Sequence, residues 1–271
     1  MIRLQISILL ILGVITLGHA QGTVDFLQSA ESRALGNSQA GAFGIQSIFG
    51  NPAGLSKVKS FGAIATAETR FAGSGILFGG AGAAIPSDLG VFGVKVGYFG
   101  IPEYNEQVLG LSYSRLLFES FSLSIQANLF NTSIQEYGSQ FNISATLGAQ
   151  TYLNKAITFG VYVQNPIQIE VAPDQFLPTI FSLGGQYKFP EKLSLLLAIE
   201  KDLDEDLGVQ AGLAYDPVEQ LNLRIGISSI ANELSFGLGY RISELLRIDA
   251  SAVIHQRLGL SPGFSLVYNK K

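Results

Sequence analysis

The sequence contains no cysteine, no tryptophan and only two histidines among its 271 residues. Without cysteine there can be no disulfide, no thiol catalysis and no cysteine-bound zinc, and two histidines are too few for a multi-histidine metal site. Charged residues make up 14% of the chain, against roughly 25% in a typical soluble domain. The net charge of −4 also argues against nucleic acid as a partner. We therefore expect no cofactor, no metal and no nucleic-acid partner.

Long hydrophobic runs are also missing. Beyond residue 20, no run approaches the roughly 18 apolar residues that a transmembrane helix needs. Yet 47% of the chain is hydrophobic, and it contains 31 glycines. Such a composition suggests either a buried α/β core or a membrane β-barrel, and the pattern along the chain has to decide between them.

Residues 1–20 have the pattern of a secretory signal peptide. Arg3 provides the positive charge, Leu4–Leu17 is apolar, and Gly18-His19-Ala20 forms a small-x-small cleavage site. The alternative is a membrane anchor, but an apolar stretch of 14 residues is too short to span a bilayer. We expect cleavage before Gln21 and export from the cytoplasm.

From residue 60 onward, apolar residues alternate with small polar ones. In one example Phe141, Ile143 and Leu147 alternate with Asn142, Ser144 and Thr146. This is the period of a β-strand, and it recurs in about fourteen segments. Their expected spans are 60–69, 74–84, 90–98, 107–116, 120–130, 139–151, 156–164, 178–188, 192–201, 206–215, 220–229, 233–241, 246–255 and 260–268. No long helical pattern interrupts the series, which disfavours a βαβ fold.

The chemistry of the two strand faces favours a membrane barrel over a secreted soluble β-sandwich. The non-apolar face is made of Gly, Ser, Asn and Gln, which suits a crowded lumen when the apolar face meets lipid. The charges within strands lie mostly on that small polar face, and they are Lys95, Arg224, Glu233, Arg241, Arg247 and Asp249. The sequence therefore predicts an all-β fold, a transmembrane antiparallel up-and-down barrel of about 14 strands.

The connections between strands sort into two sets. Compact connections such as Pro86–Gly90 and Phe189–Lys192 are expected on the periplasmic side, together with both termini, and longer ones such as Asn165–Leu177 on the outside. Tyrosines that end even-numbered strands on the apolar face would form an aromatic belt on the periplasmic side, and they are Tyr113, Tyr187, Tyr215, Tyr240 and Tyr268. Tyr152 breaks the face parity, so we expect a bulge there.

Residues 29–55, SAESRALGNSQAGAFGIQSIFGNPAGL, precede the strands and are not strand-like. The stretch from Ser32 to Gly36, followed by Asn51-Pro52-Ala53-Gly54-Leu55, resembles the amino-terminal signature of FadL-like outer-membrane proteins, including the PorV/PorQ family of Bacteroidota. The resemblance implies a plug or hatch inside the barrel. It divides the chain into a signal peptide (1–20), a plug segment (21–58) and a barrel (59–271). The alternative is a periplasmic linker.

The residues expected to matter for this plug are Arg33, Gly36, Asn51, Pro52 and Gly54. Pro52 lacks a backbone donor and Gly54 permits a positive φ, so both suit a turn from a lumenal segment into the wall. Arg33 is expected to anchor the plug to an inward carboxylate, Asp249 or Glu233. Small inward residues should leave room for the plug, and they are Gly184, Gly208, Gly212, Gly226, Gly237 and Gly239.

The carboxyl end resembles the terminal signal read by the barrel assembly machinery. That signal has the form polar-x-Gly-x-x-hydrophobic-x-aromatic, and Gly263, Leu266 and Tyr268 occupy its key positions. The barrel assembly machinery and outer-membrane lipid are therefore expected partners.

For function, the resemblance implies a non-enzymatic binding or scaffold role in type IX protein secretion, with translocon subunits or cargo carboxyl-terminal domains as partners. The alternative is FadL-like transport of long-chain fatty acids or other hydrophobic small molecules, and a plugged structural barrel is a third possibility. Transport would need an apolar lumen, but the residues on the inward strand faces are small and polar. Apolar residues that could line a lumenal site occur in the plug, and they are Phe26, Leu27, Ile45, Ile48 and Phe49. An enzyme is not expected, because no nucleophile motif accompanies His255. The expected location is the bacterial outer membrane.

Overall fold

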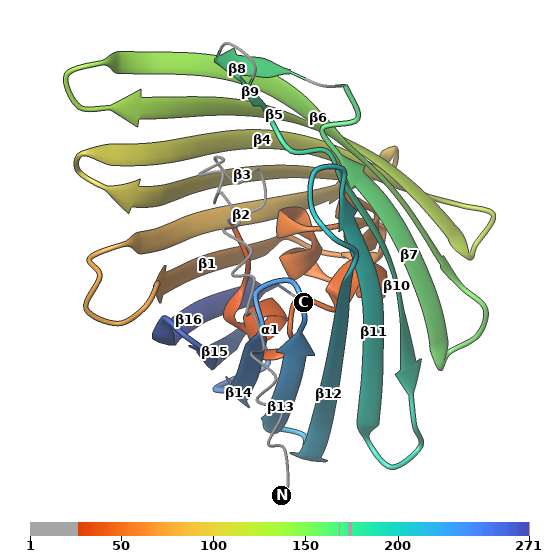
Figure 1. Ribbon diagram of the computed structural model, residues 1–271. Coiled ribbons are helices and arrows are strands. Elements are labelled where there is room, and N and C mark those ends of the chain that lie inside the picture. The colour runs from red at the N-terminus through yellow and green to blue at the C-terminus, as the bar shows by residue number, and fades with distance from the viewer. Residues whose placement is uncertain (1–26, 168, 173–174, 271) are drawn as a thin grey trace, which may run out of the picture.

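The computed structural model describes residues 27–167, 169–172 and 175–270. It contains a closed antiparallel β-barrel of 14 strands, which confirms the predicted fold class (Figure 1). The first wall strands are β1 (Gly62–Thr69), β2 (Leu77–Ser87), β3 (Gly90–Ile101), β4 (Tyr104–Leu117), β5 (Phe121–Ile134), β6 (Gly138–Tyr152) and β7 (Ile157–Gln164). The others are β10 (Ile180–Lys188), β11 (Leu193–Asp202), β12 (Gly208–Val218), β13 (Leu221–Ser228), β14 (Glu233–Arg241), β15 (Leu246–His255) and β16 (Gly259–Asn269).

Each wall strand pairs with its neighbours in the chain, with one interruption. Between β7 and β10 the chain forms a separate two-stranded hairpin, β8 (Glu170–Ala172) and β9 (Gln175–Phe176), so that β7 pairs directly with β10. The barrel closes where β1 pairs with β16, with Gly62 opposite Asn269. Closure leaves no free sheet edge across this seam, as a strand surrounded by lipid requires.

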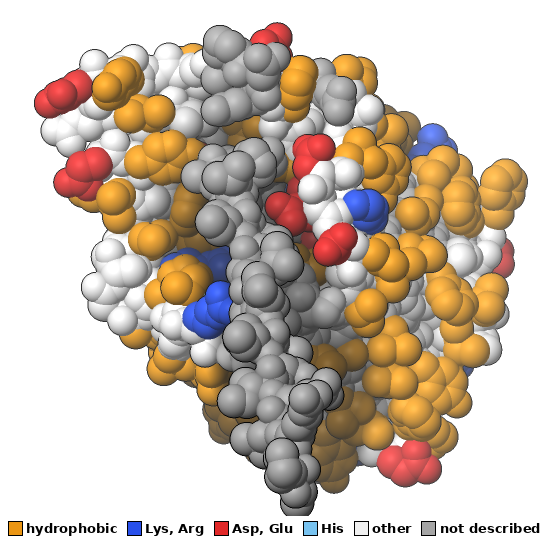
Figure 2. All heavy atoms as spheres, viewed as in Figure 1, with side chains coloured by type: hydrophobic (Ala, Val, Ile, Leu, Met, Phe, Trp, Pro, Cys, Tyr) orange, Lys and Arg blue, Asp and Glu red, His pale blue; other side chains and the backbone are white. Residues whose placement is uncertain are grey.

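The barrel wall is apolar outside and polar inside. On β6, Asn142, Ser144 and Thr146 are buried, whereas Phe141 and Ile143 are 64% and 69% exposed. Figure 2 shows hydrophobic side chains over much of the visible outer wall. This distribution is the reverse of the one in a soluble β-sandwich, whose polar face is outside. It suits a wall surrounded by hydrocarbon, because a lipid-facing Lys or Arg at mid-depth costs about 2–4 kcal/mol. None of the helices in the described residues is long and apolar enough to cross a membrane.

The two ends of the barrel differ. Short connections such as 88–89 and 189–192 lie at the end where β16 finishes, which we call the turn end; the connections 70–76 and 165–179 lie at the opposite, loop end. Tyr187, Tyr215 and Tyr240 are exposed on the wall near the turn end. The bulge expected at Tyr152 is absent, because β6 pairs with β5 and with β7 without a register shift there. Tyr152 faces inward instead, with its ring against Phe43 and Lys57.

Residues 27–58, which we call the inner segment, lie within the curved wall (Figure 1). The segment contains one short α-helix and three 3-10 helices, which are α1 (Ala30–Ala34), η1 (Gln39–Gly41), η2 (Ile45–Phe49) and η3 (Pro52–Lys57). The Ser29 side chain caps α1 by accepting a hydrogen bond from the Ser32 backbone N–H. Pro52 begins η3, where its missing N–H costs nothing.

Candidate functional site

Arg33 is the centre of a buried ion-pair network between α1 and the wall. Its Nε lies 2.9 Å from Glu68 Oε2, and its Nη1 lies 3.0 Å from Glu233 Oε2. Arg70 Nε approaches Glu68 at 2.9 Å. Arg33 is only 4% exposed. We call Arg33, Arg70, Glu68 and Glu233 the Arg33 network. Glu233 is one of the two partners expected from the sequence, whereas Glu68 was missed; its only signal was that it shares a strand face with Ile64 and Thr66.

The other expected partner, Asp249, belongs to a second network. Its Oδ1 lies 2.7 Å from Arg224 Nη1, and its Oδ2 lies 3.0 Å from Arg247 Nε. Arg247 also contacts Glu31 on α1. Each network holds two arginines and two carboxylates, so the buried charges balance, as burial in a low-dielectric interior requires. Of the two alternatives, Arg33 therefore pairs with Glu233 and not with Asp249, because the wall places two arginines beside Asp249.

Glu31 responds to this surrounding charge. Burial alone would raise the pKa of Glu31, but Arg247 and Arg224 outweigh it and hold the pKa below the ordinary value of 4.5. A carboxyl whose pKa is lower in the folded state stabilises that state above its unfolded pKa, and the stabilisation is lost as the pH falls through the folded pKa.

We therefore expect Glu31→Gln to lower the thermal stability of the barrel at pH 7. The difference from the unaltered protein should shrink as the pH falls below about 4.5, because protonated Glu31 resembles Gln. Melting curves measured across this pH range test the expectation. Glu191→Gln, in an exposed turn, is the matched control and should show no such difference. A difference for Glu31→Gln that is independent of pH would contradict the assignment.

The residues of the NPAGL stretch fasten the inner segment to itself and to the wall. Asn51 Nδ2 donates to Ala40 O at 2.8 Å and to Ala149 O at 3.2 Å, and its Oδ1 accepts from Ala53 N at 3.1 Å. Gly54 is packed so closely that a Cβ there would come within 2.4 Å of Ala42 O. These contacts explain the residue types, and they are contacts within the protein.

Glycines on the wall allow the inner segment to approach it closely. Gly36 itself has a φ of 62° and packs against Ile227, so a Cβ would meet Ile227 O at 2.4 Å. A Cβ on Gly226 would lie 2.3 Å from Gly36 N. Of the inward glycines expected to make room, Gly184, Gly212, Gly226 and Gly237 contact the inner segment, whereas Gly208 faces Ile230 and Gly239 faces Arg224 and Asp249.

The three residues of the expected assembly signal lie on β16, in the wall. Leu266 is 48% exposed on the outer face, and the ring of Tyr268 lies 6.2 Å from that of Phe61. Gly263 faces inward, where a Cβ would meet Ser251 Oγ at 2.6 Å. They take no part in either charge network, and their role in assembly remains a prediction.

One side of the lumen near the loop end is apolar, contrary to the expectation of small polar inward faces. Phe78 and Phe99 project inward from β2 and β3 with ring centroids 4.7 Å apart. They belong to a cluster that also includes residues of β4, β5 and the inner segment. We call its loop-end part the apolar patch, which consists of Leu27, Phe78, Phe99, Val108, Phe130 and Leu177. Ile45, Ile48 and Phe49 pack in the same cluster, and Phe26 lies outside the described residues.

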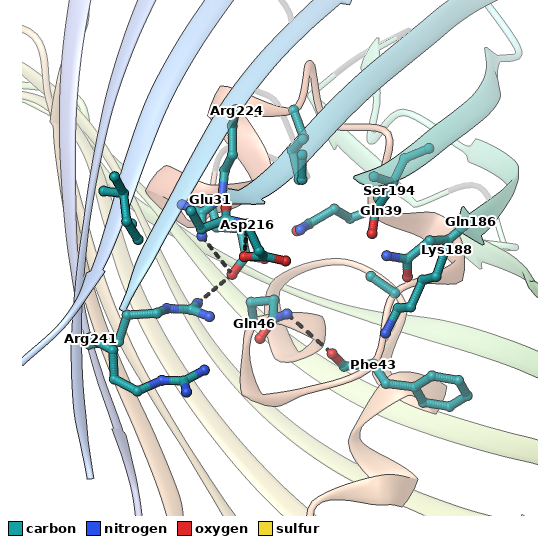
Figure 3. A pocket seen from close by; sticks show the side chains of 18 of the residues that line it. Glu31, Gln39, Phe43, Gln46, Gln186, Lys188, Ser194, Asp216, Arg224 and Arg241 are labelled. Carbon is teal, nitrogen blue, oxygen red and sulfur yellow. Dashed lines mark hydrogen bonds and ion pairs between the residues drawn. The ribbon is translucent and has the colours of Figure 1, made fainter. Parts of the chain in front are cut away.

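The other side of the lumen is polar and hollow. A cavity of about 340 Å³ opens at the loop end beside Arg33, and another of about 350 Å³ lies at the turn end beside Glu31. In Figure 3, Arg241 and Lys188 extend into the turn-end cavity on either side of Gln46. No group of three or more His, Asp or Glu side chains among the described residues is arranged to hold a metal ion.

Comparison with solved structures shows which proteins share this fold. The chain is similar to the P. putida toluene transporter TodX, with a TM-score of 0.69 and 12% identity over 89% of this chain and 98% of TodX. It is similar to the monoaromatic hydrocarbon channel CymD, with a TM-score of 0.69 and 12% identity over 92% of this chain and 99% of CymD. A FadL homologue of Pseudomonas aeruginosa aligns with a TM-score of 0.64 and 14% identity over 89% of this chain and 98% of that protein. No protein-family model and no curated protein matches the sequence. At such low identity the likeness concerns the fold, and the chain has the barrel fold of these hydrocarbon channels.

Proposed function

We propose that the protein is a bacterial outer-membrane channel that takes up small hydrophobic compounds. The observation that carries the proposal is the apolar patch, because Phe78, Phe99 and Phe130 place apolar aromatic side chains on part of an inner wall that is polar in most barrels of this kind. The apolar outer wall and a fold shared with a toluene transporter support the same conclusion. In this proposal the inner segment acts as the hatch that a compound must pass.

The type IX secretion role implied by the PorV/PorQ resemblance is not the function proposed here. The three solved structures compared above are two hydrocarbon transport proteins and a FadL homologue, which favours uptake of hydrophobic compounds. The sequence made transport the alternative because the inward faces were expected to be small and polar. The apolar patch contradicts that expectation and so favours transport. An origin in Bacteroidota remains a prediction.

The absence of tryptophan makes a direct binding test possible. Phe99→Trp would place the only tryptophan of the protein in the apolar patch. We expect 4-bromotoluene or a dibrominated fatty acid to quench its fluorescence with a saturable dependence on concentration, because bromine quenches an indole that it contacts. Binding should be measured with the purified barrel in lipid nanodiscs.

The matched control is Phe236→Trp, on the outer face of β14, where Phe236 is 41% exposed. Partition of the probe into lipid should quench this tryptophan in simple proportion to concentration. If the tryptophan at position 99 behaved in the same proportional way, the apolar patch would not be a binding site and the proposal would fail.

A further inference from the structure

Three cavities follow one another along the polar side of the lumen. Between the loop-end and turn-end cavities lies a narrow one of about 20 Å³. Gln28, Asn37 and Tyr162 line both the narrow and the loop-end cavity, and Gln39 and Gln46 line both the narrow and the turn-end cavity. The described lining of the narrow cavity also includes Ser32, Ser47 and Asn51, so hydrogen-bonding groups continue from one end of the lumen to the other.

The narrow cavity is large enough for about one water molecule, which needs roughly 10–15 Å³ of such space. Tyr162 projects into the lumen from β7, is only 6% exposed, and packs with Ala40 of the inner segment and Ala198 of β11. Its side chain is the largest in the described lining of the narrow cavity. Tyr162 therefore contributes the bulkiest side chain to the constriction.

The described lining of the loop-end cavity carries more acidic than basic groups. Arg33 and Arg70 at its wall are already engaged with Glu68 and Glu233. Its described lining also contains Asp202, Glu205 and Asp206, so acidic groups are in excess there. In addition, Gln210 is 2% exposed and lines this cavity, and its Oε1 has no hydrogen-bond partner among the described residues. A buried acceptor without a partner in the protein is satisfied by a donor from water or from a solute.

The turn-end cavity is closer to electrical balance. Arg224 and Arg247 at its wall pair with Asp249 and Glu31. The remaining charged residues of its described lining are two basic ones, Lys188 and Arg241, and two acidic ones, Asp216 and Glu219. Selection by charge is therefore expected at the loop end, and selection by size at Tyr162.

We propose that these cavities form a polar passage for water and small hydrophilic cations, separate from the apolar patch and closed to larger solutes by Tyr162. The passage runs beside the inner segment and does not require that segment to leave the barrel. It is a second activity of the lumen and does not depend on the uptake of hydrophobic compounds.

The test is the conductance of the full barrel in a planar lipid bilayer in potassium chloride. Tyr162→Ala is expected to raise the single-channel conductance at least about fivefold, because it widens the narrowest point of the passage. Tyr187→Ala makes the same chemical change on the outer wall and should conduct as the unaltered barrel does. Under a salt gradient, the reversal potential of the Tyr162→Ala channel should show a preference for K⁺ over Cl⁻. A conductance of Tyr162→Ala no higher than that of Tyr187→Ala, or a preference for Cl⁻, overturns the proposal.

A second variant covers the case in which Tyr162→Ala disturbs folding. The protein has no cysteine, so Asn37→Cys would carry a single thiol where the loop-end and narrow cavities meet. A small cationic methanethiosulfonate reagent should label it faster than an anionic one of similar size, because the acidic excess attracts cations. Labelling that is equally slow with both reagents, or faster with the anionic one, contradicts the proposed passage.

Discussion

Arg33→Ala should loosen the inner segment and destabilise the barrel by about 3–5 kcal/mol. Arg33 is 4% exposed, and its guanidinium pairs with both Glu68 and Glu233. Its loss leaves two buried carboxylates that Arg70 alone must balance, and Arg70 Nη1 lies 3.8 Å from Glu233 Oε1. An uncompensated buried charge costs much more than the lost contact itself.

Amide hydrogen exchange over residues 27–58 and the temperature of barrel unfolding measure this effect together. We expect faster exchange in α1 and a lower unfolding temperature for Arg33→Ala. Arg257→Ala, an exposed arginine at the loop end, removes the same charge and should change neither quantity. Equal exchange in the two variants would show that the Arg33 network does not hold the inner segment.

A rescue experiment separates charge balance from side-chain size. Combining Arg33→Met with Glu233→Gln removes one charge of each sign at nearly constant volume and leaves Arg70 paired with Glu68. We expect this double variant to recover a large part of the stability that Arg33→Ala loses, because the remaining Arg70 and Glu68 charges compensate each other. If it is as unstable as Arg33→Ala, packing by the arginine stem outweighs its charge.

The second large effect is expected at Gly226, where one added methyl group should displace the inner segment. A Cβ there would lie 2.3 Å from Gly36 N and 2.4 Å from Leu35 C. These are backbone atoms, which cannot rotate away, so the segment has to shift as a unit. We expect Gly226→Ala to cost about 1–3 kcal/mol or more and to accelerate amide exchange around Leu35.

Gly79→Ala is the matched control for this prediction. It makes the same substitution in a wall strand, but the nearest atom to the added Cβ would be Thr66 O at 3.9 Å, an ordinary contact. The two variants share the change in strand propensity, so their difference isolates the clash with the inner segment. Equal stability of the two variants would mean that the inner segment does not press against β13.

The strands and their faces could be predicted because alternation is a local signal. Each stretch, such as Phe141 to Leu147, alternates with a period of two. Every strand of a closed barrel must turn one face outward and the other into the lumen, so the same pattern recurs in each strand. The charges on the small polar face followed from the same reasoning, since Lys95, Arg224 and Asp249 are all buried in the lumen. The predicted strand spans agree with the observed strands to within a few residues at each end.

The sequence pattern left single residues unassigned, or assigned them wrongly, where their side chains suit both faces of the wall. Leu77 and Phe78 are both large and apolar, so the pattern alone does not say which of them faces the lumen. Tyr152 has an apolar ring and a polar tip. The sequence analysis expected a bulge that would place it in the outer aromatic belt, whereas its ring lies in the lumen beside Phe43. In both cases the side chain is compatible with either environment.

The sequence alone determined an approximate strand number, an apolar outer face, and the division between an irregular beginning and a barrel. Each of these depends on residues close together in the chain. Which carboxylate meets Arg33, which glycines touch the inner segment and which side of the lumen is apolar were decided only by the tertiary structure. Those contacts join β1 to β14 and the inner segment to β13, and they depend on how the strands are arranged around the closed barrel. Local periodicity sets the face of each residue, but the closed geometry of the barrel sets what lies opposite it.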